Sequence, residues 1–167
     1  MIEKKIELLK FIIGRYDHYY DSVNNKANLY LALNTFLLGG LATVYYGLGQ
    51  QAGISRPCFI LMTIMLILNV WSITVALMAT KPYNNTVTDN KDGSLIYFGD
   101  VADYPANMHE KLFNDYNEDR QYKDLVTQTH LLAIGLKRKF KFMGTATYLL
   151  AGQILLTLII FLLIINK

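Results

Sequence analysis

The chain has 167 residues, of which 53% are hydrophobic and 17% are charged, with a formal net charge of +3. Its mean hydropathy of +0.24 is higher than is usual for a soluble domain of this length. Nine acidic residues between Asp89 and Asp124 cancel the nine basic residues of the segment 81–141, so no nucleic-acid partner is expected. Cys58 is the only cysteine, which excludes a disulfide within the chain.

The first 26 residues are predicted to form a cytoplasmic helix with a seven-residue repeat. Positions spaced alternately by four and three keep one seam facing a partner helix, as in a coiled coil. The seam consists of Ile2, Ile6, Leu9, Ile13, Tyr16, Tyr20, Val23, Ala27 and Tyr30. Because no proline interrupts the passage from this helix into the first span, we predict one rod of about 45 residues that continues into the membrane. This polar-patterned start also argues against a cleavable signal peptide.

Three stretches contain no ionisable side chain other than tyrosine or cysteine. Each holds an apolar run of about 20 residues, the length that crosses about 30 Å of hydrocarbon. The predicted membrane spans are residues 27–48, 57–80 and 142–165. We therefore expect an all-α integral membrane protein with long cytoplasmic helical extensions, forming a single membrane domain over residues 1–167.

Residues 81–141 are predicted to form a cytoplasmic loop and helices. The turn-rich segment from Asn84 to Gly93 and the apolar stretch after it favour a small hairpin or an irregular loop. One helix is expected to begin after Pro105, and a second runs into the third span. The predicted apolar face of this second helix is Leu125, Thr129, Leu132, Leu136, Phe140 and Met143.

The distribution of Lys and Arg predicts the orientation in the membrane. Residues 1–26 carry five and residues 81–141 carry nine, whereas Arg56 and Lys167 are the only others. Positive charge stays in the cytoplasm, so the N-terminus and the large loop are expected inside and the C-terminus outside. The predicted head-group anchor, with a phosphate site as the alternative, is the cluster Lys137, Arg138, Lys139 and Lys141.

The sequence offers little that would support catalysis. Asp17 and His18 are neighbours on a helix, about 100° apart, and cannot converge on one atom. The three histidines, His18, His109 and His130, share no metal-ligand spacing. We expect no enzyme activity, no cofactor and no metal; a hydrolase that uses Asp17, His18 or His130 is the alternative.

A polar stripe leads the first helix toward the membrane. Asp17, Asp21, Asn24 and Asn28 recur at spacings of four, three and four, and asparagine is a poor choice for a merely solvated helix. The stripe fits a buried network between helices or a site for a ligand with a base and a sugar. The candidate sensing residues are Asp17, Tyr20, Asp21, Asn24, Asn25, Lys26 and Asn28.

Amide side chains also occur inside the predicted spans. Counted from the inner edges, Asn69 and Gln153 lie about 16 Å deep and Asn34 lies about 10 Å deep. Such groups hold spans together within one protomer; alternatively, they join protomers or line a polar path. Gly39, Thr43 and Gly47 form a small-residue face suited to close helix packing.

The segment from Asp21 to Gly40 (DSVNNKANLYLALNTFLLGG) resembles the membrane effectors of bacterial Pycsar anti-phage systems. Their stretch D/N-x-K-A-x-x-x-L-x-x-N is matched here by Asn24, Lys26, Ala27, Leu31 and Asn34. SLIYFGD, which starts at Ser94, and QTHLLAIGLKRKF, which starts at Gln128, are similar to later segments of that family.

The resemblance implies an effector that impairs the bacterial inner membrane when a cyclase makes a cyclic pyrimidine nucleotide. No separate nucleotide-binding domain is evident, so either the cytoplasmic helices and the 81–105 loop bind the signal or a sensing partner does. We expect a homo-oligomer in contact with membrane lipid. The alternative is a constitutive scaffold or adaptor subunit that docks a soluble partner through its coiled-coil seam.

Overall fold

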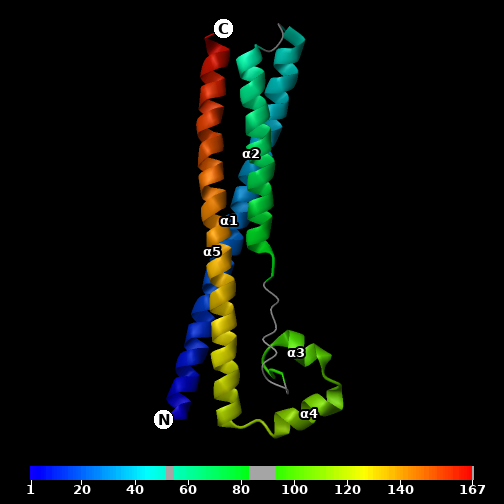
Figure 1. Ribbon diagram of the computed structural model, residues 1–167, viewed down its shortest axis with the longest axis vertical. Helices are drawn as coiled ribbons and strands as arrows, with labels where there is room; N and C mark the ends of the chain where they lie inside the picture. The colour runs from blue at the N-terminus through cyan, green and yellow to red at the C-terminus, as the bar shows by residue number, and fades with distance from the viewer. Residues whose placement is uncertain (52–54, 83–92, 167) are drawn as a thin grey trace. The chain divides into compact units, whose positions relative to one another are not determined.

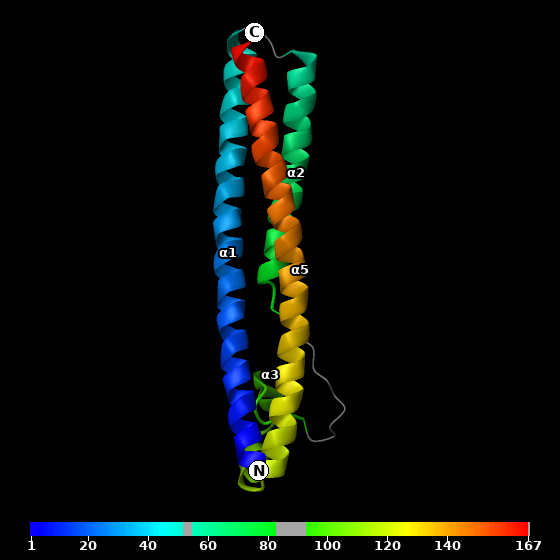
Figure 2. The same cartoon turned by 90° about the vertical axis from the view of Figure 1, so that its left-hand side faces the viewer.

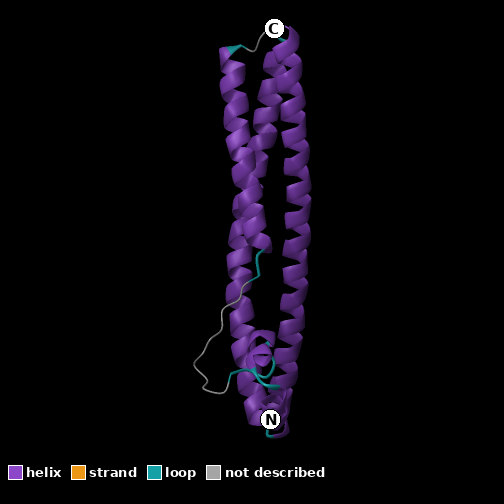
Figure 3. Ribbon diagram, turned by 90° about the vertical axis from the view of Figure 1, so that its right-hand side faces the viewer, coloured by secondary structure: helices purple, strands orange, loops and turns teal. Residues whose placement is uncertain are grey.

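The computed structural model describes residues 1–51, 55–82 and 93–166, and over these residues the regular structure is entirely helical (Figure 1). The helices are α1 (Ile2–Gln51), α2 (Arg56–Thr80), α3 (Phe98–Asp103), α4 (Ala106–Asn114) and α5 (Glu118–Ile165). The predicted all-α class is confirmed. The segment expected to form a hairpin or an irregular loop lies largely outside the described residues; residues 93–97 form no strand, and α3 follows them (Figure 3).

Helix α1 is a single rod of 50 residues, as the lack of proline predicted. Every position of the predicted seam is buried or half-buried, from Ile2 to Tyr30. The seam is therefore covered by other parts of the same chain. Helix α5 is equally continuous over 48 residues and includes the predicted third span.

The described chain divides into two compact units. One comprises Met1–Asp21 and Pro82–Lys137, and the other comprises Ser22–Lys81 and Arg138–Lys167. In the second unit, α2 and the corresponding parts of α1 and α5 pack side by side (Figure 2). Three of the described helices, α1, α2 and α5, are long and apolar enough to cross a membrane. This agrees with the predicted number of spans.

Two buried clusters hold the second unit together. The first joins Val23 and Ala27 of α1 to Ala79 of α2 and Met143 of α5. The second, toward the other end of α2, consists of Cys58, Met62, Met65 and Ile160, with Leu37, Leu41, Leu48, Leu61 and Ile164 packed against it. Large apolar side chains also cover the outside of the bundle, such as Phe36 and Trp71, which are 77% and 56% exposed. A helix bundle in hydrocarbon has this pattern, because lipid tails are as apolar as the side chains.

The predicted apolar face of α5 is only partly correct. Leu125, Leu136 and Met143 are buried, whereas Phe140 is 47% exposed. Lys139 takes the inward position instead and is only 5% exposed. A lysine thus occupies a place in the bundle where the periodicity alone favours an aromatic ring.

Candidate functional site

Three amide side chains meet inside the membrane bundle. Asn69 Nδ2 on α2 lies 3.0 Å from the backbone oxygen of Asn34, 3.3 Å from Asn34 Oδ1 and 3.1 Å from Gln153 Oε1 on α5. All three side chains are at most 1% exposed. Asn69 is therefore the centre of an amide network (Asn34, Asn69 and Gln153) that connects all three membrane helices.

The outer members of the network are each anchored to backbone. Asn34 Nδ2 donates to the Tyr30 oxygen at 2.7 Å, and Gln153 Nε2 donates to the Leu68 oxygen at 3.3 Å. The bonds to Asn69 bring the three amides together at one level of the bundle, whereas counting from the assumed inner edges gives Asn34 a depth about 6 Å smaller than that of Asn69 and Gln153. Helix α1 runs through the assumed inner edge without a break, so its structure does not mark where counting should begin.

Lys139 forms a second polar connection, at the end of α2. Its ammonium group donates to the Ala79 oxygen at 2.6 Å and to Asn24 Oδ1 at 3.4 Å. The last four carbonyls of a helix lack partners within the helix, and a cation there also suits the helix dipole. Burial lowers the pKa of Lys139 below its usual value. Of the predicted basic cluster, Lys137, Arg138 and Lys141 are exposed, whereas Lys139 is turned inward.

The candidate sensing stripe is mostly exposed. Asp17, Asp21, Asn25, Lys26 and Asn28 are exposed. The two exceptions each contact α5. Tyr20 is half-buried and its hydroxyl donates to the Leu132 oxygen at 2.9 Å, and Asn24 is half-buried and accepts from Lys139.

No group of acidic, histidine or cysteine side chains in the described ranges is arranged to hold a metal ion. Asp17, His18 and His130, which the hydrolase alternative requires, are all exposed side chains on helices. None of them makes a contact that would activate a nucleophile in the part of the chain that the structure describes.

The first unit contains a buried polar cluster that sequence reasoning missed. Asp124 Oδ2 accepts from the Leu95 backbone amide at 3.0 Å and from the Tyr116 hydroxyl at 3.2 Å. Burial and the Asp124 charge together raise the pKa of Tyr116. Ser94 Oγ accepts from the Tyr97 amide at 3.1 Å and from Gln128 at 3.4 Å. These bonds fix the 93–97 segment on α5.

Gly93 begins that segment in a conformation that favours glycine. Its φ is +59°, and an added Cβ would collide with the Tyr104 hydroxyl. An L-residue is strained at such a φ. Within the SLIYFGD motif, Asp100 accepts from the Ser94 amide at 2.7 Å. The motif therefore folds on itself and on α5, which gives its residues a structural role.

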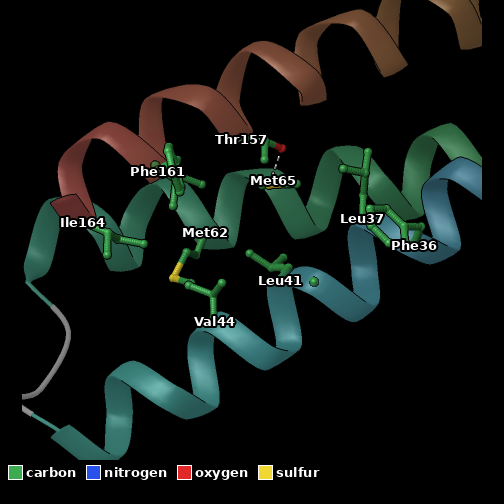
Figure 4. A pocket seen from close by; sticks show the side chains of 11 residues that line it. Phe36, Leu37, Leu41, Val44, Met62, Met65, Thr157, Phe161 and Ile164 are labelled. Carbon is green, nitrogen blue, oxygen red and sulfur yellow. Dashed lines mark hydrogen bonds between the residues drawn. The ribbon is translucent and has the colours of Figure 1, made fainter.

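An apolar groove opens on the membrane bundle toward the other end of α2 (Figure 4). Phe36, Leu41, Met62 and Phe161 line it, and Thr157 is its one polar side chain. The Thr157 hydroxyl contacts the Met65 sulfur at 3.7 Å and also bonds to its own helix. Because the groove offers a polar ligand almost nothing, the amide network and Lys139 are the better candidate site.

The fold and the site thus define an all-helical membrane protein whose three candidate spans are joined internally by amides. The family model for the Pycsar effector protein domain matches residues 8–166, and the chain belongs to this family. It is 28% identical over 153 residues to the Pycsar effector protein EcPycTM of Escherichia coli. The alignment covers 86% of this chain and 82% of EcPycTM. No solved structure matches. The family assignment from the sequence motifs is confirmed, and it makes the chain a membrane effector of anti-phage defence.

Proposed function

We propose that this effector impairs the integrity of the bacterial inner membrane when a cyclic pyrimidine nucleotide, or a partner that senses one, acts on its cytoplasmic part. The amide network is the observation that carries the proposal. Its three side chains are fully buried between helices whose other buried side chains are mostly apolar. Placing a polar side chain inside a membrane span costs free energy, and such side chains are commonly part of a functional site.

The network provides a reversible closure. In the closed bundle the amides bond to one another, and after separation of α2 from α1 and α5 water satisfies them. Separation of apolar helices alone would expose only hydrocarbon-like surface to water. The amides therefore lower the free energy of a hydrated, leaky state relative to an all-apolar bundle.

In this proposal the N-terminus and residues 81–141 are cytoplasmic and the C-terminus is outside, as the distribution of Lys and Arg predicts. Exposed members of the stripe, such as Asp17, Asp21, Asn25 and Lys26, are accessible to a ligand or partner. Lys137, Arg138 and Lys141 are exposed and contact lipid phosphates. Asn24 and Lys139 transmit the signal, since their contact joins α1, α5 and the end of α2.

We also propose that the active form is a homo-oligomer. Gly39, Thr43 and Gly47 are exposed, and a Cβ added at either glycine would meet nothing within 4 Å. This small-residue face is thus unused within the protomer and allows close approach of another helix. A constitutive scaffold is the rival function, but its required docking seam is covered within the chain from Ile2 to Tyr30.

The test is a measurement of membrane potential in cells that express the full chain with a pyrimidine cyclase. Depolarisation on cyclase induction is expected for the natural sequence and for Thr74→Val, which removes an exposed hydroxyl bonded only to its own helix. Depolarisation is expected to be lost or to lose its dependence on the cyclase in Asn69→Leu. Cells that remain polarised with every cyclic nucleotide supplied would contradict the proposal and favour the scaffold.

A further inference from the structure

Two polar atoms inside the membrane bundle have no hydrogen-bond partner among the described residues: Ser72 Oγ and Asn69 Oδ1. Ser72 is 0% exposed and Asn69 is 1% exposed. Residues three apart on a helix lie on the same face with their Cβ atoms about 5–6 Å apart. Both atoms therefore belong to one small region of the interior, beside the amide network.

The unbonded state of the Ser72 hydroxyl has a specific cause. Each described threonine, such as Thr63 and Thr74 on the same helix, donates to a backbone oxygen three or four residues earlier. The corresponding acceptor for Ser72 is the Leu68 oxygen. That oxygen accepts instead from Gln153 Nε2 at 3.3 Å. The amide of α5 has thus taken the usual acceptor of Ser72.

Leaving both atoms unbonded would cost about 1–3 kcal/mol each. Nearly all buried polar groups in proteins have a partner, which is often an ordered water molecule. A Ser72 hydroxyl that can donate and an Asn69 oxygen that can accept are complementary to one water molecule placed between them. The water accepts from the serine and donates to the amide oxygen.

We propose that Asn69 and Ser72 bind a single water molecule in the core of the membrane bundle. A cation is the less suitable ligand, because biological cations take about six oxygen ligands. Only two side-chain oxygens here lack a hydrogen-bond partner among the described residues, and Asn34 Oδ1 and Gln153 Oε1 each already accept from Asn69 Nδ2. The binding site itself does not depend on the proposed leak. Its role there, as the first hydrated position when α2 separates, rests on the proposed function.

The site can be tested on the full chain in lipid bilayers, without nucleotide, by solid-state NMR transfer of magnetisation from water to protein. Transfer to the Asn69 side-chain amide is expected to build up several-fold faster than transfer to the backbone amide of Ala76. Ala76 is the dry reference, because it is 0% exposed and lies one turn beyond Ser72 on α2. In Ser72→Ala and in Ser72→Val, transfer to Asn69 is expected to fall to the Ala76 level.

Two results would overturn the proposal. One is transfer to Asn69 that never exceeds the Ala76 level, or that survives in both Ser72 variants. The other is a change in the Asn69 resonances when sodium replaces choline in the buffer, which would assign the site to a cation. Ser72→Ala removes only one small group, so its fold is expected to persist, and its backbone spectrum verifies this. Because no leak is measured, failure of the proposed function would leave this outcome unchanged.

Discussion

Replacement of Asn69 by leucine tests whether the amide network stabilises the closed bundle. The substitution keeps a side chain of similar size but removes the only donor to Asn34 Oδ1 and Gln153 Oε1 that the structure shows in the described chain. Each of these buried oxygens then lacks a bond worth about 1–2 kcal/mol in a membrane protein. Asn69→Leu is therefore expected to lower the free energy of unfolding by about 2–4 kcal/mol.

The assay is reversible unfolding of the full chain in bicelles, with Thr74→Val as the matched control on the same helix. The control is expected to change the free energy by less than about 0.5 kcal/mol, because its hydroxyl is exposed and bonded locally. Equal stability of Asn69→Leu and Thr74→Val would contradict a stabilising role of the network. The same conclusion would follow if the triple variant Asn34→Leu, Asn69→Leu and Gln153→Met were less stable than Asn69→Leu alone. The triple variant leaves no unsatisfied amide and is expected to recover most of the loss.

Three further predictions concern other parts of the molecule. Burial lowers the pKa of Lys139 below its usual 10.5, so between the two values the unfolded chain holds a proton that the folded chain has lost. The free energy of unfolding is expected to rise with pH in that window relative to Lys139→Met, and parallel pH profiles of the two would contradict this. Gly93→Ala is expected to destabilise the fold by about 1 kcal/mol or more, whereas Gly14→Ala, in an exposed helix interior, stabilises it by about 0.5–1 kcal/mol; thermal unfolding that shifts both the same way would count against the positive φ. Asp124→Leu removes the acceptor of the Leu95 amide, and hydrogen exchange at that amide is expected to accelerate about 10–100-fold; an unchanged exchange rate would show that Asp124 does not fix the segment.

The membrane helices were predictable because their signals are local. A run of about 20 residues without charge has few alternatives to a membrane span, and the absence of proline allowed α1 to be predicted as one rod. The equal depths of Asn69 and Gln153 followed from counting along α2 and α5. Burial of the seam on α1 also followed from spacing alone, since helical periodicity defines a face.

The contacts that give Lys139 and Asp124 their roles were not predictable, because they join residues far apart in the sequence. Lys139 lies in a run of cations that all resemble lipid anchors. Only the register of α5 against the end of α2, which brings it to the Ala79 oxygen, sets it apart. Asp124 bonds to Leu95, 29 residues earlier, and one acidic residue among many gave no sign of this. The same applies to Ser72, whose unusual state depends on Gln153 of another helix.

Under the proposed function, the helix connectivity limits which rearrangement can open the bundle. Helices α1 and α5 each contribute to both compact units, whereas α2 lies wholly within the second. Breaking α1 or α5 inside the membrane would expose backbone groups at several kcal/mol each, so a movement of α2 against an intact α1–α5 pair is the less costly change. This movement of α2 breaks the interhelical hydrogen bonds of Asn69, at a free-energy cost of about 2–4 kcal/mol. A signal that favours the open state by about 5.5 kcal/mol can reverse a 99:1 equilibrium. Under the proposed function, a bundle whose opening costs about this much is stable at rest and can be opened by one tightly bound ligand.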